Sequence, residues 1–191
     1  MNKLTYYIIA IILLQSIIFG SVRLSDTNLD QSSYTITQFA TSSELSLKIT
    51  LEYLKISTVT KNGKPFTRID IPGEGFRYAV GKPRLPVIRK MIEIPEGCKV
   101  EWDITIDKED ILSLRANNYP EPILPVQPFQ RKSVSPRQKS FSIDEELYES
   151  DHFYEPGTIQ IGNIFQMGSI RGAMLEFCPV DYNPVQNSLK I

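Results

Sequence analysis

The chain has 191 residues, with 21 lysines and arginines against 22 aspartates and glutamates and a formal net charge of −1. A charge this close to zero gives no reason to expect nucleic acid as a partner. Neither of the two cysteines has the nearby second ligand that a zinc site needs. We therefore expect no metal and no other cofactor.

The chain opens with an apolar run over residues 4–19, preceded by Lys3 and followed by the small residues Gly20 and Ser21. One positive charge, a short apolar core and a small-residue exit are typical of a secretory signal peptide. The alternative is an uncleaved membrane anchor, but the run is slightly short of the roughly 20 residues that a span needs. We expect a signal peptide over residues 1–21. The protein would then be secreted, periplasmic or on the cell surface, and would meet the membrane only through this segment during export.

Alternating apolar and polar residues predict a strand over residues 45–53 with one buried face. Leu45, Leu47, Ile49, Leu51 and Tyr53 alternate with polar residues. Leu54 then shifts the apolar parity, which predicts a β-bulge near Tyr53 and Leu54. Asn62-Gly63 is a favoured two-residue hairpin turn, and residues 66–71 would return as the partner strand.

The segment 81–88 predicts a stiff, extended elbow. Pro83 and Pro86 cannot donate to a central ladder and bias their neighbours away from helix. Gly81 allows a turn that other residues resist. The strand that follows should run to Ile94 and stop at the Pro95-Glu96-Gly97 turn.

The strictest alternation lies in residues 100–106. Val100, Trp102, Ile104 and Ile106 alternate with polar residues, which places them in the predicted core. We expect this strand to pair with the one ending at Ile94. Helical signals are weak, and Ser142 to Glu145 has only the spacing of a capping box.

Many short strands, 13 prolines and 10 glycines predict an all-β chain, a β-sandwich or jelly-roll-like antiparallel domain with few or no helices. Residues 22–191 would form this single domain. Near its end, residues 172–177 read as a strand, Asn183-Pro184 as a turn, and residues 188–191 as a returning strand only just begun. We therefore expect the domain to be truncated at its C-terminal strand.

Residues 120–139 differ from the rest because five prolines forbid regular pairing through most of the stretch. Four basic side chains without an acid among them lie in its second half: Arg131, Lys132, Arg137 and Lys139. The stretch is either a solvated loop or an exposed basic loop that contacts a partner.

The sequence offers no catalytic pair. Nothing in the spacing places His152 beside Cys98 or Cys178, as a cysteine nucleophile and its base would require. In an exported protein the two cysteines can form a disulfide, and the alternative is two separate buried thiols. We expect the chain not to be an enzyme.

Several short motifs resemble, in their order and spacing, the propeptide domain of gingipain-type cysteine peptidases. The matching residues are Gly81, Pro83, Leu85, Pro86, Ile94, Pro95, Tyr148, Tyr154, Glu155, Pro156, Gly157, Arg171, Gly172, Pro179, Tyr182, Asn183 and Pro184. The resemblance implies a β-sandwich that accompanies the enzyme during export, aids its folding and blocks its active site until proteolysis removes it. The missing catalytic domain is a departure from the family, so the chain is either a cut precursor or a free-standing relative.

Our leading hypothesis is a secreted propeptide that restrains a cognate cysteine peptidase, in cis or in trans. Arg131, Lys132, Arg137 and Lys139 would then contact the peptidase, or mark a nick site for activation. The alternative is a β-sandwich adhesion or carbohydrate-binding module of a cell-surface protein. A third hypothesis is the protease itself, read from an incomplete chain.

Overall fold

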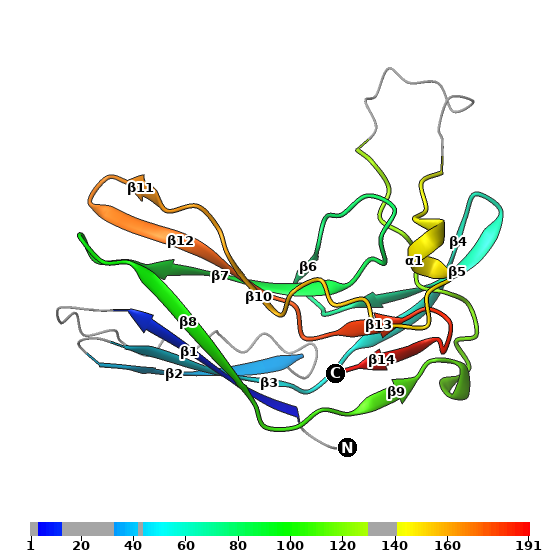
Figure 1. Cartoon of the computed structure of the whole chain (residues 1–191), viewed down its shortest axis with the longest axis horizontal. Helices are drawn as coiled ribbons and strands as arrows, with labels where there is room; N and C mark the ends of the chain where they lie inside the picture. Colours follow the sequence, from blue (N-terminus) through cyan, green and yellow to red (C-terminus); the bar gives the residue numbers. More distant parts are fainter. Residues whose placement is uncertain (1–3, 13–32, 42–43, 130–140) are drawn as a thin grey trace. The chain divides into compact units, whose positions relative to one another are not determined.

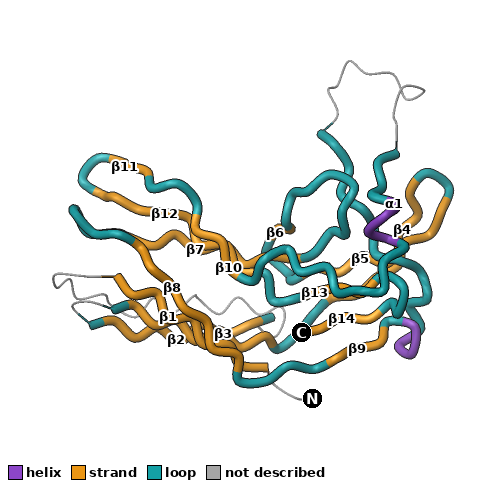
Figure 2. The backbone as a smooth tube through the Cα atoms, in the orientation of Figure 1, coloured by secondary structure: helices purple, strands orange, loops and turns teal. Residues whose placement is uncertain are grey.

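The computed structural model describes residues 4–12, 33–41, 44–129 and 141–191. In these residues the chain is almost entirely strand and loop (Figure 2), as the sequence predicts. The only helical elements there are η1 (Arg115–Asn117) and α1 (Glu145–Tyr148). None of the described helices is long and apolar enough to cross a membrane.

The chain divides into two compact units. Unit 1 contains Met1–Tyr53, Lys90–Glu109 and Ile161–Leu175, and unit 2 contains Leu54–Arg89, Asp110–Gln160 and Glu176–Ile191. The boundaries fall inside two strands, β7 (Pro86–Glu93) and β12 (Ile170–Phe177). These strands belong to a sheet with the order β10-β12-β7-β6, in which β10 is Ile159–Ile161, β6 is Gly75–Phe76, and β11 (Phe165–Met167) also pairs with β12.

Unit 1 contains a four-stranded sheet with the order β2-β3-β1-β8 (Figure 1). Its strands are β1 (Leu4–Ile12), β2 (Tyr34–Ala40), β3 (Leu45–Leu51) and β8 (Val100–Ile106). The predicted alternation of β3 is confirmed, since Leu45, Leu47, Ile49 and Leu51 are all buried. β1 is formed by part of the predicted signal segment, so cleavage after residue 21 would remove this strand from the sheet. The signal peptide itself stays a prediction.

The predicted pairing of β8 with the strand ending at Ile94 is wrong, because β8 pairs with β1. The Ile94 N–H instead donates to the Arg171 carbonyl (2.8 Å). The Arg171 guanidinium also donates to the carbonyls of Pro95 (2.6 Å) and Cys98 (3.2 Å). The turn after Ile94 is therefore bound to β12 and does not close a tight hairpin.

The predicted burial of β8 is also wrong. Trp102 is 47% exposed and Ile106 is exposed, while Val100 and Ile104 are half-buried. The predicted alternation itself is correct. Ala10 of β1 pairs with Trp102 of β8 and with the buried Leu45 of β3, so Trp102 lies on the same face of the sheet as Leu45. β8 lies at the edge of the sheet, so its apolar face is covered less well than that of β3.

Unit 2 contains the predicted hairpin and a smaller sheet. β4 (Lys55–Lys61) and β5 (Lys64–Asp70) are joined by Asn62 and Gly63, whose φ angles of 50° and 74° fit the expected turn. β13 (Asp181–Asn183), β14 (Ser188–Lys190) and β9 (Ile111–Ser113) form a sheet in the order β13-β14-β9. The core cluster comprises Ile69, Leu85, Val87, Leu114, Ile123, Cys178, Val180, Tyr182 and Leu189.

Two local predictions need correction. The parity shift near Tyr53 and Leu54 is not a bulge: β3 ends at Leu51 and the chain passes there from unit 1 to unit 2. The cap of α1 is Asp144 rather than Ser142, since the Asp144 carboxylate accepts a hydrogen bond from the Leu147 N–H (3.1 Å).

Candidate functional site

The four basic residues predicted to contact a peptidase lie outside the described residues. Arg131, Lys132, Arg137 and Lys139 fall between residues 129 and 141, and the structure describes both flanks. Both flanking segments belong to unit 2.

The proline-rich segment that enters the loop, residues 121–127, is held by backbone hydrogen bonds from two sides. On one side, Thr67 donates to the Pro122 carbonyl and accepts from the Leu124 N–H, both at 2.8 Å. On the other side, the Arg84 N–H donates to the Leu124 carbonyl (3.0 Å). Prolines prevent a regular ladder here, but isolated bridges still fix the segment.

Gly81 lies on the same side of the segment as Arg84 and adds two hydrogen bonds. Its N–H donates to the Val126 carbonyl (2.8 Å), and its own carbonyl accepts from the Asp144 N–H (3.0 Å). Gly81 thus links the segment entering the loop to the segment leaving it. Its φ of 82° favours glycine, and a Cβ at this position would lie only 3.2 Å from the Asp144 nitrogen.

Gln127 and Ser142 hold the two ends of the loop together directly. The Gln127 side-chain Nε2 donates to the Ser142 carbonyl (2.8 Å), and the Ser142 N–H donates back to Gln127 Oε1 (3.0 Å). Nε2 also donates to the Pro125 carbonyl (3.0 Å). We call this pair the loop neck.

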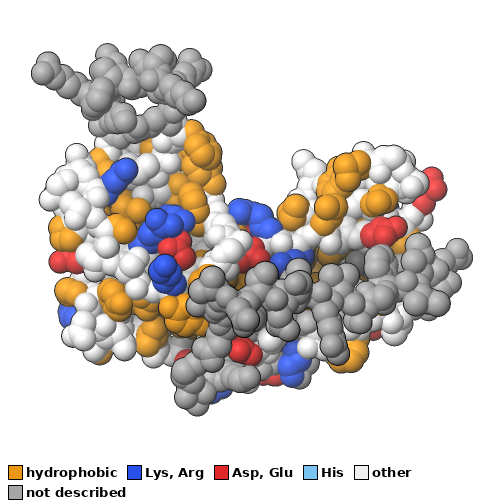
Figure 3. Space-filling model, turned by 180° about the vertical axis from the view of Figure 1, so that it is seen from behind, with side chains coloured by type: hydrophobic (Ala, Val, Ile, Leu, Met, Phe, Trp, Pro, Cys, Tyr) orange, Lys and Arg blue, Asp and Glu red, His pale blue; other side chains and the backbone are white. Residues whose placement is uncertain are grey.

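Exposed aromatic side chains lie beside the loop neck. Phe129 is 84% exposed, and its ring stacks on Tyr78 with the centroids 4.6 Å apart. The Phe129 N–H donates to the Tyr78 hydroxyl (3.2 Å). Val80 and Ile143 are also exposed. Hydrophobic side chains reach the surface in several places on the face drawn in Figure 3.

The motif tyrosines have a structural role at the same segment. The Tyr182 hydroxyl accepts from the Ile123 N–H (3.3 Å), and the Tyr148 hydroxyl donates to the Ile123 carbonyl (2.7 Å). Tyr182 also donates to Asn187 Oδ1 (3.0 Å), and its burial raises its pKa to about 12. Both phenols therefore act as neutral hydrogen-bonding groups that fix Ile123.

The other motif residues are likewise structural. Leu85 is buried in the core, Pro83 lies opposite Pro125 in an isolated bridge, and Pro86 begins β7. Asn183 and Pro184 make the predicted turn after β13. The Asn183 side chain there accepts from the Gln186 N–H (3.0 Å), and the Pro184 carbonyl accepts from the Asn187 N–H (3.3 Å). In unit 1, Pro95 provides a carbonyl to Arg171, as described above.

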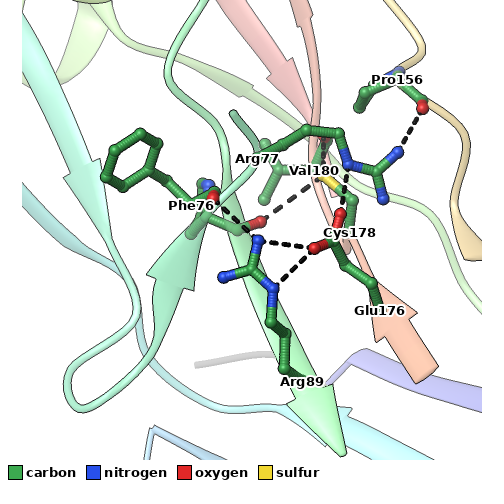
Figure 4. A network of polar contacts seen from close by, with 8 residues as sticks. Phe76, Arg77, Arg89, Pro156, Glu176, Cys178 and Val180 are labelled. Atoms are coloured by element: carbon green, nitrogen blue, oxygen red, sulfur yellow. Dashed lines mark hydrogen bonds and ion pairs between the residues drawn. The ribbon is translucent and has the colours of Figure 1, made fainter. Parts of the chain in front are cut away.

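An ion network that the sequence did not reveal lies in unit 2 (Figure 4). Glu176 lies between two arginines, with Oε1 2.6 Å from Arg77 Nε and Oε2 2.6 Å from Arg89 Nε. The Arg77 side chain is only 9% exposed. Its Nε is not aligned for a hydrogen bond with Glu176, and its Nη2 has no hydrogen-bond partner among the described residues. No sequence signal joins these residues, since Arg77 and Glu176 are 99 positions apart.

Asp70 has a pair of arginines as well. Arg84 Nη1 lies 2.6 Å from Asp70 Oδ1, and Arg68 Nε lies 2.7 Å from Oδ2. Burial alone would raise the pKa of Asp70, but the hydrogen bonds from Arg84 and Arg68 outweigh burial and lower it. Arg84 also lies over the Phe76 ring, 4.1 Å from its centroid. The Asp70 carboxylate therefore fixes the elbow that borders the loop segment.

Cys98 and Cys178 are two separate thiols in the structure, and their disulfide in the exported protein stays a prediction. Cys178 is buried, and its Sγ contacts the carbonyls of Val180 (3.4 Å) and Pro86 (3.5 Å). Burial raises its pKa to about 12, so it is a poor nucleophile. His152 is exposed, and no group of three or more metal-ligating side chains occurs among the described residues.

Comparisons with known proteins agree with the motifs. The family model for C25 propeptides (Propeptide_C25) matches residues 29–191. Lys-gingipain HG66 and Lys-gingipain W83, both from Porphyromonas gingivalis, are each 30% identical to this chain over 139 residues. The matches cover 72% of this chain but only 8% of either relative, so the chain corresponds to a small part of those proteins.

Two solved structures from Porphyromonas gingivalis share the fold. One, on the zymogenic latency of gingipain K, has a TM-score of 0.68 at 25% identity, covering 86% of this chain and 90% of the other. The second, a complex of RgpB pro- and mature domains, has a TM-score of 0.61 at 18% identity, covering 86% and 77%. The motifs, the all-β fold and the family match over residues 29–191 show that this chain belongs to the C25 propeptide family, the propeptides of gingipain-type cysteine peptidases.

Proposed function

We propose that this chain is an exported propeptide that inhibits a gingipain-type cysteine peptidase and assists its folding. The observation that supports this most directly is the restraint on both ends of the basic loop. Residues 121–127 are bound from two sides, and Gln127 and Ser142 hold the loop ends together. A loop that is fixed at its ends loses less conformational entropy on binding than a free one.

The charge of the loop suggests how it acts. Arg131, Lys132, Arg137 and Lys139 provide four cations in nine residues with no acid among them. If the peptidase prefers basic residues, one of these side chains enters its specificity pocket opposite a carboxylate. Truncating a buried, hydrogen-bonded charge of this kind lowers the binding free energy by about 2–5 kcal/mol.

The test is inhibition of the cognate peptidase by the purified chain, followed by Arg131→Ala, Lys132→Ala, Arg137→Ala and Lys139→Ala made singly. We expect the wild-type chain to inhibit and one variant, at Arg131 or Lys132, to lose most of the inhibition. Equal inhibition by all four variants would remove the basic residues from the mechanism. A wild-type chain that does not inhibit would refute the proposal itself.

Folding assistance needs its own measurement. The denatured catalytic domain would be refolded with and without the chain, and recovered activity measured after the chain has been removed. We expect a higher yield with the chain present. The proposal that the chain is exported depends on the apolar run of residues 4–19. Sequencing the N-terminus of the exported protein would locate the cleavage predicted after residue 21.

One observation favours the alternative of a carbohydrate-binding module. Trp102 is 47% exposed instead of buried, and an exposed aromatic ring is what a sugar-binding platform needs. Trp102→Ala would then abolish glycan binding while leaving peptidase inhibition unchanged. Absence of glycan binding by the wild-type chain would dismiss this function.

A further inference from the structure

We propose that Phe129 and Tyr78 form an aromatic anchor that binds the catalytic domain of the peptidase beside its active-site cleft. This inference rests on the proposed function and adds a second contact to it, separate from the basic side chains. The anchor is the stacked pair itself, and Val80, two residues after Tyr78, is a further exposed apolar side chain.

Two contacts hold the Phe129 ring in place, whereas an exposed side chain without a structural role is usually not held. Phe129 is 84% exposed, yet its ring is held 4.6 Å from Tyr78 at an interplanar angle of 20°. The Tyr78 hydroxyl accepts from the Phe129 N–H, which fixes the backbone under the ring. Aromatic side chains that are already ordered lose little entropy on binding and are enriched among the hot spots of interfaces.

The backbone that follows Tyr78 is also held by hydrogen bonds. Val80 precedes Gly81, whose N–H is bonded to Val126 and whose carbonyl is bonded to Asp144. The ideal Cβ position of Gly81 lies 3.4 Å from the carbonyl carbon of Ile143, so Ile143 packs directly against this turn. The backbone at Gly81, three residues after Tyr78, is therefore bonded to both flanks of the loop.

The position of Phe129 in the chain gives it the same partner as the basic residues of the proposed function. Phe129 is two residues from Arg131 and three from Lys132, so the Cα atoms of Phe129 and Arg131 are at most about 7 Å apart in any loop conformation. A standard interface covers about 800 Å² on each partner, a radius of about 16 Å if it is circular. If Arg131 or Lys132 enters the active site, Phe129 falls inside the footprint of the catalytic domain. The surface opposite it should be apolar, since Phe129 has no polar group to satisfy.

The test measures affinity for, and inhibition of, the cognate peptidase by the purified chain and three variants. Binding is measured to a peptidase whose catalytic cysteine has been replaced by alanine, so that affinity is obtained without cleavage. Phe129→Ala should weaken binding at least about 30-fold. Tyr78→Phe keeps the ring but loses the acceptor for the Phe129 N–H, and should weaken binding about 3- to 10-fold. Phe39→Ala is the matched control, because Phe39 is an exposed phenylalanine of unit 1.

The outcomes separate this inference from the proposed function. If the wild-type chain binds and Phe129→Ala binds within about threefold of it, the anchor is wrong while the inhibitor remains. If the wild-type chain binds without inhibiting, the inhibitory function is wrong. The ratio of the affinities of wild type and Phe129→Ala then still shows whether the aromatic pair contributes to binding. If the wild-type chain does not bind, both are wrong. If Phe129→Ala abolishes self-association or glycan binding instead, the pair serves that other ligand and the inference is overturned.

Discussion

The side-chain amide of Gln127 and the backbone of Ser142 are hydrogen-bonded in both directions across the ends of the basic loop. This pair closes a segment of 14 intervening residues, whose flanks are also linked through Gly81, bonded to Val126 on one side and to Asp144 on the other. Because loop closure has an entropic cost, the contact should matter more for the order of the loop than for the stability of unit 2.

Gln127→Ala should therefore loosen the loop without unfolding the domain. We expect faster cleavage by trypsin after the basic residues of 131–139 and weaker inhibition of the peptidase, with a loss of unfolding free energy of only about 1–2 kcal/mol. Gln38→Ala, at an exposed glutamine of β2, is the control and should change neither quantity. Equal trypsin cleavage rates for wild type and Gln127→Ala would show that the neck does not order the loop.

Gly81→Ala should destabilise the chain more than the same change at Gly63. Both glycines have similar φ angles, 82° and 74°, so both substitutions carry backbone strain of about 1 kcal/mol. Only at Gly81 does the new Cβ meet another atom, the Asp144 nitrogen at 3.2 Å, while nothing lies within 4 Å of it at Gly63. Urea unfolding of the two variants measures the difference, which we expect to be about 1 kcal/mol or more. Equal losses would mean that the segment 143–144 moves away without cost.

Glu176→Gln should be strongly destabilising. It leaves the Arg77 guanidinium buried without its counter-charge, and breaking a buried pair in this way costs about 3–5 kcal/mol. The matched control is Glu155→Gln, whose carboxylate is 62% exposed and pairs with Lys190, and it should cost less than about 1 kcal/mol. The measurement is the free energy of unfolding in urea at pH 7. A loss below about 1 kcal/mol for Glu176→Gln would indicate that water or another group solvates Arg77.

Acid should weaken the fold partly through Asp70. Its pKa in the folded protein is lowered below the ordinary value of 3.8, so the unfolded chain binds the proton more tightly. The stability that its arginine pairs provide is present above pH 3.8 and is lost as the pH falls toward the lowered pKa. Asp70→Asn should therefore be less stable at pH 7 and should lose less stability between about pH 5 and pH 2.

Melting temperatures of wild type and Asp70→Asn at several pH values measure this difference. Asp103→Asn, at an exposed aspartate of β8, serves as the control variant. If the melting temperatures of wild type and Asp70→Asn change in parallel with pH, Asp70 does not contribute to the acid sensitivity of the fold.

The two thiols should differ in reactivity. Cys178 is buried with its pKa raised to about 12, whereas Cys98 is half-buried in a turn. An aromatic disulfide reagent should label one thiol in the native protein, at Cys98, and two after denaturation without reductant. No label after denaturation would show that the exported protein contains the disulfide that the sequence suggested.

Elements that depend on neighbouring residues alone could be predicted from the amino-acid sequence. The Asn62-Gly63 hairpin, the alternation of β3 and the turn at Asn183-Pro184 depend on φ preferences and side-chain period, which neighbouring residues fix. The order of the proline, glycine and tyrosine motifs also indicated the family, which the match over residues 29–191 confirms.

The pairing of strands and the burial of their faces depend on contacts between distant residues, which the folded chain alone reveals. Alternation places Trp102 on the apolar face of β8, but burial depends on whether that strand lies inside the sheet or at its edge. In the same way, the prolines of residues 120–128 predicted an irregular stretch, whereas Thr67 and Arg84, 57 and 40 positions before Leu124, supply the bonds that order it. The Arg77–Glu176 pair and the Gln127–Ser142 contact follow the same rule, because a contact between distant residues has no local signal in the sequence.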